Sequence, residues 1–188
     1  MDTEAQIIVQ TYNKETKQLE PQQYPPPSGE LLPREVLYFD GNQNKWLPSK
    51  FSDNDTQISN IERLKFLDYN LEYSTYKHEE RCKEFLRHIK ESEADFICFQ
   101  ECTEGYLNFF QSQDLIKNNY YMVTNDMTGY PHFGLMMSKY PCLAYQTDFI
   151  SQQKRVMLFI ELKINGKKTA VADLHLEYRF HDSDFRTQ

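Results

Sequence analysis

Hydrophobic and polar residues follow regular periods only after about residue 36 of this chain. Residues 78–92 predict an amphipathic helix, because their apolar positions recur every three or four residues. Residues 64–70 and 95–100 predict strands, and the second is apolar at nearly every position, as in a strand covered on both faces. The three segments therefore predict a strand–helix–strand unit. The apolar positions of the helix are Cys82, Phe85, Leu86 and Ile89.

Beyond this unit the pattern predicts more strands than helices. A second helix is expected over residues 104–117, and Asn165-Gly166 is a strong signal for a two-residue hairpin turn. One early crossover followed by hairpins, without a GxGxxG motif, favours an α/β sandwich with mixed sheets over a Rossmann fold. The remaining strands are expected near 120–124, 133–138, 155–164 and 168–176.

The first 60 residues differ in composition from the rest. Residues 1–35 form a leader rich in Pro and Gln, expected to be disordered, since six of the eight prolines precede residue 50. A short polyproline ligand is an alternative to a plain linker there. Residues 36–60 predict a hairpin around Asp40-Gly41, followed by a linker. We expect this hairpin to lie on the outside of the main domain, residues 61–188.

Length and composition indicate one globular domain with a sizeable core. The chain has 188 residues, 39% of them hydrophobic, and a net charge of −7. It lacks the basic surface expected of a protein that grips duplex nucleic acid nonspecifically. A bound divalent cation would reverse the local field, so a nucleic-acid substrate stays open. The oligomeric state is not indicated by these features.

Compartment signals favour an intracellular protein, nuclear or cytoplasmic. No stretch approaches the roughly 18 apolar residues of a membrane helix, so no membrane span is expected. The acidic start lacks the basic and apolar regions of a secretory signal. The four cysteines have no metal-ligand spacing and are expected to be reduced, mostly buried thiols.

Residues able to act on a phosphate ester stand at the ends of predicted strands: Asn70, Glu101, the segment at Gly134, and His175. The crossover brings the first two together, because the carboxyl ends of parallel neighbours meet at one sheet edge. Glu101 is the natural Mg²⁺ ligand, with Mn²⁺ as an alternative metal. Asn70 could orient phosphate or water, and His175 could donate to a phosphate oxygen in the transition state.

Each of these residues also has an ordinary structural interpretation. Glu101 could supply the favourable first-turn charge of the next helix. Asn70 could cap a turn, and His175 could be a core residue with its hydrogen bonds satisfied.

Four segments together resemble the endonuclease/exonuclease/phosphatase superfamily, and within it the 5′-tyrosyl-DNA phosphodiesterases most. The resemblance spans about residues 61–188, and Arg186 and Gln188 match the "R…Q" that opens a later helix. The segments are LDYNLEY at 67–73, like "TYN"; Glu80-Arg81 with ADFICFQECT at 94–103, like "ER…ADIICLQEVT"; FGLMMSKYP at 133–141, like "YGLMILSKYP"; and HLE at 175–177, like "HLES".

The resemblance implies the N-terminal part of a four-layer, DNase I-like α/β sandwich and a Mg²⁺-dependent nuclease or phosphatase active in DNA repair. It implies that Glu101 binds the metal, and that Asn70 and His175 are catalytic and contact the phosphate. Tyr178 falls where the family has a substrate-contacting serine. The implied first-choice partner is a DNA 5′ end with a tyrosyl adduct. Abasic DNA, RNA tails, inositol phosphates and sphingomyelin are substrates elsewhere in the superfamily.

Two family segments have no match in the sequence. These are "GDxN", which supplies the water-activating Asp, and the terminal "SDH"; Ser183-Asp184-Phe185 comes too early and lacks the His. We therefore expect a domain that is incomplete at its C-terminus, with an exposed sheet edge or face. We also expect the 188-residue chain alone to be inactive. The alternative is an inactive fragment, or a degenerate domain that binds phosphate or a partner.

Overall fold

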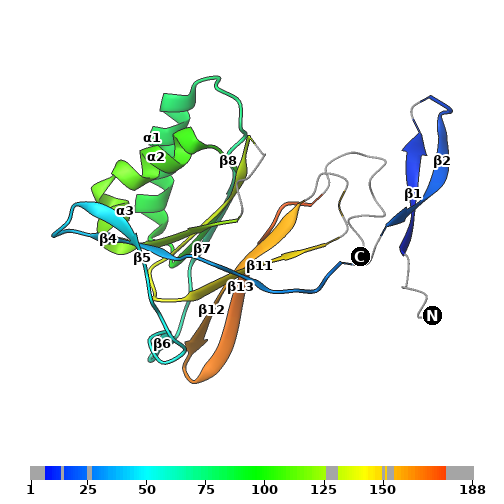
Figure 1. Ribbon diagram of the computed structural model, residues 1–188. Helices are drawn as coiled ribbons and strands as arrows, with labels where there is room; N and C mark the ends of the chain where they lie inside the picture. Colours follow the sequence, from blue (N-terminus) through cyan, green and yellow to red (C-terminus); the bar gives the residue numbers. More distant parts are fainter. Residues whose placement is uncertain are drawn as a thin grey trace.

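The computed structural model describes residues 7–13, 15–24, 27–125, 131–149, 151 and 155–176 (Figure 1). Its helices are α1 (His78–Ser92), α2 (Glu104–Ser112) and α3 (Asp114–Asn119). Its strands are β1 (Ile7–Asn13), β2 (Gln18–Tyr24), β3 (Leu32–Arg34), β4 (Leu37–Asp40), β5 (Lys45–Pro48), β6 (Gln57–Ile58), β7 (Phe66–Asn70), β8 (Phe96–Cys102), β9 (Tyr121–Thr124), β10 (Phe133–Ser138), β11 (Leu143–Asp148), β12 (Val156–Ile164) and β13 (Lys167–Leu174).

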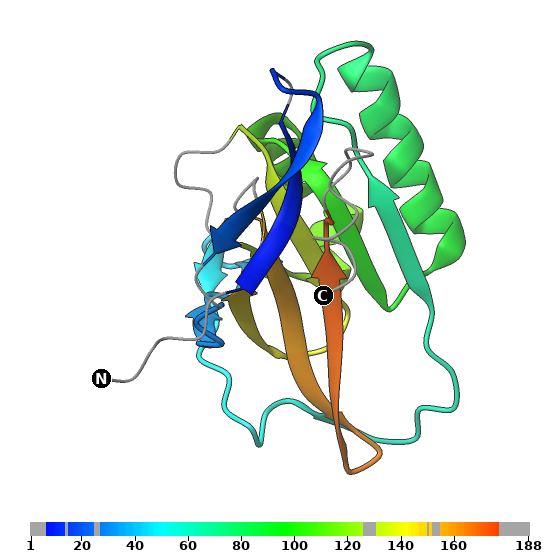
Figure 2. The same cartoon turned by 90° about the vertical axis from the view of Figure 1, so that its right-hand side faces the viewer.

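Two mixed sheets pack face to face, and the helices cover the outer face of one of them (Figures 1 and 2). The six-stranded sheet has the order β5-β4-β9-β10-β8-β7. The five-stranded sheet has the order β13-β12-β11-β3, with β6 parallel to β12. The predicted α/β sandwich with mixed sheets is therefore confirmed.

The core has two parts, separated by the six-stranded sheet. Phe99 and Leu135 belong to the cluster under the helices, whereas Phe96 and Met136 belong to the cluster between the sheets. All four side chains are fully buried. Because neighbouring residues of a strand point to opposite faces, β8 is buried on both sides, which explains its nearly continuous apolar sequence.

The predicted strand–helix–strand unit is present. Helix α1 has the predicted bounds, and β7 and β8 run parallel with Asn70 opposite Gln100. The hairpin predicted at Asn165-Gly166 joins β12 to β13, and both turn residues have positive φ, 51° and 79°.

The predicted helix over 104–117 is two helices in the structure. Gln113, between α2 and α3, has extended backbone angles, and its side-chain amide donates to the Phe109 carbonyl at 3.1 Å. The chain then turns, so that Ile116 of α3 is fully buried. The sequence contains no Pro or Gly at this break, which is why periodicity alone predicted one helix.

The N-terminal 60 residues contribute more structure than the sequence predicted. The leader expected to be disordered contains β1, β2 and β3, and β3 pairs with β11 of the five-stranded sheet. The predicted hairpin is present as β4–β5, but it extends the six-stranded sheet through β9 instead of lying outside it. These short segments join the sheets through backbone hydrogen bonds, which side-chain patterns do not reveal. Among the described residues, no helix is long and apolar enough to cross a membrane.

Candidate active site

Asn70 and Glu101 meet where β7 and β8 end. Asn70 Nδ2 donates to Glu101 Oε1 at 3.0 Å, well inside the distance within which two groups could serve one cation. Asn70 Oδ1 also accepts from the Glu72 amide at 2.8 Å, so the same side chain caps the turn after β7. The predicted meeting of these two residues is confirmed, while their catalytic roles stay predictions.

A bulge in β8 directs Glu101. Phe99 pairs with Leu135 and Cys102 with Phe133, so Gln100 and Glu101 together stand opposite the single residue Gly134. Glu101 has a φ of 54°, a left-handed conformation that costs a non-glycine residue about 1 kcal/mol or more. Such strain is concentrated at functional sites, and it keeps Glu101 out of the regular strand.

The following helix does not need Glu101 for its first turn. Thr103 caps α2 by accepting from the Tyr106 amide at 3.5 Å, and Glu104 supplies the first-turn negative charge. The ordinary structural interpretation of Glu101 is therefore not the one that the structure favours.

His175 reaches the same place from the other sheet. It follows β13, and its Nε2 lies 3.5 Å from Glu101 Oε1. Its side chain keeps 23% exposure, so it is partly open to solvent and not enclosed in the core. Asn70, Glu101 and His175 thus converge from three strands, as the sequence predicted. Tyr178, Arg186 and Gln188 lie outside the described residues.

A polar layer lies beneath these three residues. Gln100 Nε2 donates to Asp68 Oδ1 at 2.7 Å and to Asp173 Oδ1 at 2.6 Å. Asp68 precedes Asn70 by two positions and Asp173 precedes His175 by two, so each pair shares one face of the chain. Burial raises the pKa of Asp173 to about 6, and the Asp68 charge adds to this effect. Sequence reasoning missed this layer because it joins residues far apart in the chain.

Gly134 makes room for this layer. A Cβ atom at Gly134 would lie 3.0 Å from Asp173 Oδ2 and 3.1 Å from Asn125 Oδ1. The Gly134 amide also donates to that Asn125 oxygen. A glycine inside a predicted strand was the available signal for such a close approach.

Two aromatic residues and one cation complete the surroundings of the site. The Tyr73 amide donates to Glu101 Oε2 at 3.3 Å, and the Tyr73 ring stacks on His132. Burial lowers the pKa of His132; the Arg155 charge lowers it further, while Glu101 opposes both. Sequence reasoning did not identify these residues as part of the site: Tyr73 ends the LDYNLEY segment but had no role assigned to it, and His132 and Arg155 belong to no recognised spacing.

The donor set fits one loosely held Mg²⁺. In the described parts of the chain, no group of three or more His, Cys, Asp or Glu side chains could hold a metal ion. Mg²⁺ is commonly bound by one or two carboxylates, with water and phosphate oxygens completing its octahedron. The Glu101 carboxylate is 16% exposed. Its Oε1 accepts from Asn70 and lies 3.5 Å from His175 Nε2, and its Oε2 accepts from Tyr73, so lone pairs remain for such an ion, most of all on Oε2.

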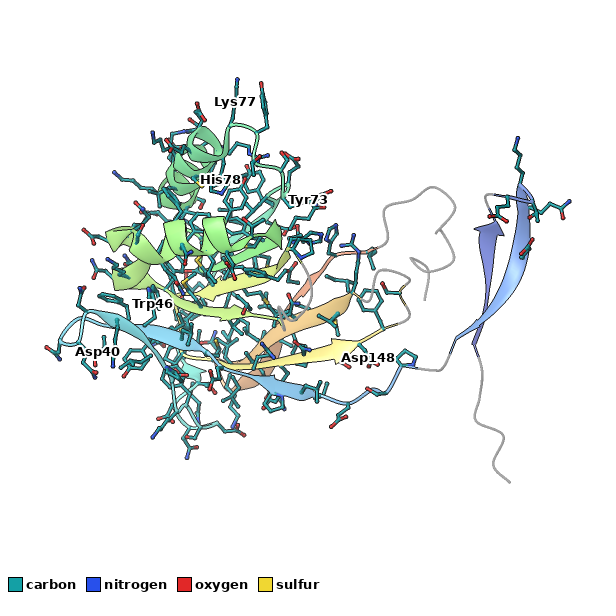
Figure 3. All side chains as sticks on the ribbon, turned by 45° about the horizontal axis from the view of Figure 1, so that its top comes forward. Asp40, Trp46, Tyr73, Lys77, His78 and Asp148 are labelled. Atoms are coloured by element: carbon teal, nitrogen blue, oxygen red, sulfur yellow. The ribbon has the colours of Figure 1, made fainter. Side chains whose placement is uncertain are left out.

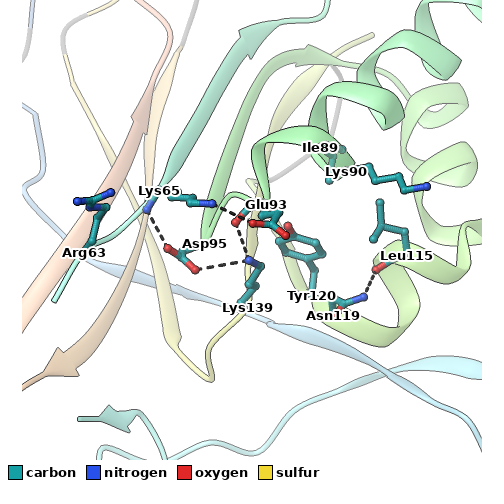
Figure 4. Close-up of a pocket in the computed structure, with 10 residues that line it drawn as sticks. All are labelled: Arg63, Lys65, Ile89, Lys90, Glu93, Asp95, Leu115, Asn119, Tyr120 and Lys139. Carbon is teal, nitrogen blue, oxygen red and sulfur yellow. Dashed lines mark hydrogen bonds and ion pairs between the residues drawn. The ribbon is translucent and has the colours of Figure 1, made fainter. Parts of the chain in front are cut away.

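The pocket in Figure 4 lies near the starts of β7 and β8, whereas Asn70 and Glu101 lie where these strands end. Its volume is about 540 Å³. Lys65 pairs with Glu93 at 3.0 Å, and Lys139 lies 3.6 Å from Asp95. These paired charges link the starts of the two strands. The pocket is therefore separate from the Asn70–Glu101 site.

Fold and site together define a two-sheet α/β sandwich of the DNase I-like class, with an Asn–Glu–His cluster at one sheet edge. No family model and no curated protein matches the sequence. Solved structures of TDP2 do match. The D. rerio TDP2 complexed with single-strand DNA product has a TM-score of 0.59 and 18% identity, over 66% of this chain and 50% of that one.

Two further TDP2 structures are similar to this chain to about the same extent. A humanized D. rerio TDP2 has a TM-score of 0.56 and 18% identity, over 66% of this chain and 55% of that one. C. elegans TDP2 has a TM-score of 0.58 and 17% identity, over 65% and 38%. This chain thus matches about half the length of these proteins or less. Its fold is that of these TDP2 structures, in agreement with the DNase I-like α/β sandwich that the sequence predicted.

Proposed function

We propose that this site hydrolyses phosphate esters with Mg²⁺, and that the first-choice substrate is a 5′-phosphotyrosyl-DNA bond. The convergence of Asn70, Glu101 and His175 within hydrogen-bond or ion-pair distance carries the proposal. The fold shared with TDP2, including one TDP2 bound to single-strand DNA product, supports the choice of substrate.

Each residue has a distinct role in this proposal. Glu101 would hold the metal, whose positive charge would polarise a nonbridging phosphate oxygen. The hydrogen bond between Asn70 and Glu101 fixes the amide beside the phosphate position. His175 Nε2 donates a hydrogen bond to a second phosphate oxygen, where negative charge grows in the transition state. The left-handed backbone at Glu101 holds the carboxylate toward this position before substrate arrives.

A second candidate is a domain that binds phosphate without hydrolysing it. Among the described residues, the nearby carboxylates Asp68 and Asp173 both accept from Gln100 Nε2, which gives each a structural role in the polar layer and does not by itself assign either as the base. Binding and turnover must therefore be measured separately.

The deciding experiment uses the 188-residue protein and, where the reading frame continues, its extended form. Calorimetric titration with Mg²⁺ and inorganic phosphate measures binding. A panel comprising a 5′-phosphotyrosyl oligonucleotide, an abasic duplex, an RNA tail, an inositol phosphate and sphingomyelin measures turnover. We expect metal-dependent phosphate binding in both forms. We expect no turnover by the 188-residue chain, and cleavage of the phosphotyrosyl bond before the others by the extended form. Binding without turnover of any ester in either form would leave only the second candidate.

Glu101→Gln tests the metal assignment. The change removes a charge but almost no volume, so we expect Mg²⁺ affinity to fall at least about tenfold and any hydrolysis at least about a hundredfold. Thermal unfolding should change little. The matched control is Glu104→Gln, a change at an exposed glutamate three residues farther along the chain. This variant should keep the Mg²⁺ affinity and the hydrolysis rate of the wild type. Unchanged metal affinity in Glu101→Gln would refute the assignment.

A further inference from the structure

Tyr73 places an exposed aromatic ring at the wall of the candidate site. Its backbone amide donates to Glu101 Oε2 at 3.3 Å, so the residue adjoins the proposed metal ligand. One face of its ring lies on His132, with centroids 5.1 Å apart and planes at 24°. Even so, Tyr73 is 55% exposed. A large ring open to solvent beside a charged site has a face available for a ligand.

The loop that carries Tyr73 is fixed on both sides of it. Arg81 donates to the carbonyl of Glu72 at 3.0 Å and to that of Ser74 at 2.6 Å, and it also pairs with the Glu72 carboxylate. Glu72 has a φ of 56°, a backbone conformation that these contacts maintain. Because the ring is already positioned, little conformational entropy is lost when a ligand stacks on it.

The start of the same loop is anchored to the core. Leu71 is fully buried, its amide donates to the Gln100 carbonyl at 2.9 Å, and its carbonyl accepts from the Tyr106 hydroxyl at 3.0 Å. Tyr76, farther along, is 71% exposed, and Lys77 Nζ lies 5.4 Å from its ring centroid. Tyr76 therefore offers a matched comparison on the same loop.

We propose that Tyr73, backed by His132, is a stacking platform for a planar ring carried by the group esterified to the substrate phosphate. The inference rests on the proposed function, because it takes the phosphate position from Asn70 and Glu101. The hydrogen bond from the Tyr73 amide to Glu101 makes Tyr73 a neighbour of the proposed metal ligand. Both a nucleobase and the phenol ring of a tyrosyl adduct have this chemistry.

Stacking on such a ring adds about tenfold to affinity or more. Calorimetry with Mg²⁺ would compare adenosine monophosphate and O-phosphotyrosine amide with two ligands that lack the ring, ribose 5-phosphate and inorganic phosphate. If its ring stacks on Tyr73, adenosine monophosphate should bind about tenfold tighter than ribose 5-phosphate. By the same reasoning, O-phosphotyrosine amide should bind about tenfold tighter than inorganic phosphate. The stronger of the two identifies the ring that the platform prefers.

Three variants test whether the Tyr73 ring is the source of the higher affinity for ring-bearing ligands. Tyr73→Leu keeps an apolar side chain but removes the ring, and should abolish the advantage of ring-bearing ligands while leaving ribose 5-phosphate binding unchanged. Tyr73→Phe should retain the advantage, and Tyr76→Leu should behave as wild type. The single tryptophan, Trp46, lies well away from Tyr73 (Figure 3), so calorimetry is preferred to tryptophan fluorescence as the measurement.

Phosphate-free ligands separate this inference from the proposed function. Saturation-transfer NMR with adenosine and tyrosinamide reports contact to the ring protons without any need for a phosphate site. A transfer lost in Tyr73→Leu supports the platform even where inorganic phosphate does not bind, which would count against the proposed function alone. Equal transfer in wild type and Tyr73→Leu, or equal affinity for ligands with and without a ring, would overturn the platform.

Discussion

At the scale of single residues, the site depends on two departures from regular strand structure. Glu101 adopts a left-handed backbone in the β8 bulge, and Gly134 opposite it lacks a side chain. The first directs the carboxylate toward Asn70 and His175. The second lets Asp173 and Asn125 approach the strand closely.

Gly134→Ala should destabilise the fold by about 1–3 kcal/mol, because the new methyl group meets polar atoms at 3.0 and 3.1 Å. Urea denaturation measures the change in the free energy of unfolding. Gly41→Ala is the control, since a Cβ there has no atom within 4 Å. Equal stability of the two variants would show that the strands relax around the methyl group.

Asp173 makes stability depend on pH. Its folded-state pKa of about 6 lies above the usual value of 3.8, so above both values the buried charge costs folding energy. That cost disappears as pH falls through 6 toward 4. Asp173→Asn should therefore raise stability at pH 7.5 by about 2 kcal/mol, with the advantage vanishing near pH 4.

Thermal unfolding of Asp173→Asn and wild type across this pH range measures the effect. The exposed Asp53→Asn variant is the control and should follow wild type. A constant difference between Asp173→Asn and wild type at every pH would mean that the carboxyl does not titrate within this window.

At the scale of elements, the loop between β7 and α1 depends on one side chain from the helix. Arg81 holds two carbonyls of the loop, and its guanidinium lies 5.8 Å from the Tyr106 ring centroid. This contact gives a structural reason for the arginine of Glu80-Arg81, the pair that resembles the family's "ER". Arg81 fixes the loop that follows Asn70, the predicted phosphate-contacting residue.

Arg81→Met should loosen this loop while keeping apolar contact with Tyr106. We expect amide hydrogen exchange over residues 71–77 to speed up at least about tenfold, with the rest of α1 unaffected. Arg87→Met removes an exposed ion pair with Glu84 and Glu91 and serves as the control, since such pairs contribute little. Unchanged exchange in the loop would show that its backbone contacts suffice.

At the scale of the whole molecule, β7 and β13 stand at the ends of their sheets within the part of the chain that the structure describes. Phe66 on β7 is 56% exposed and Leu174 on β13 is 41% exposed. An apolar strand at a sheet end is a site for association with another chain, because its outer backbone groups have no strand partner. The exposed sheet edge or face expected from the sequence stays a prediction.

Phe66→Thr should reduce self-association, because threonine favours strands but removes the exposed ring. Sedimentation velocity over a range of protein concentrations measures the effect. Tyr76→Thr removes a similarly exposed ring from a loop and should leave association unchanged. Equal sedimentation of Phe66→Thr and wild type at every concentration would show that the β7 edge does not mediate association.

The sequence by itself determined the features that depend on neighbours along the chain. The apolar spacing within residues 78–92 defined α1, Asn165-Gly166 defined its hairpin, and the order of polar residues at strand ends located Asn70 and Glu101. Helical periods, turn conformations and motif spacing are local, so they can be recognised without knowing what packs against them.

Only the tertiary structure decided the features that join distant segments. The leader strand β3 pairs with β11, Gln100 bonds Asp173 across 73 positions, and the Tyr73 ring stacks on His132. The left-handed backbone of Glu101 likewise arises from the bulge opposite Gly134. These contacts depend on how two sheets and a loop meet in space, and residues that meet only there leave no period or spacing in the sequence.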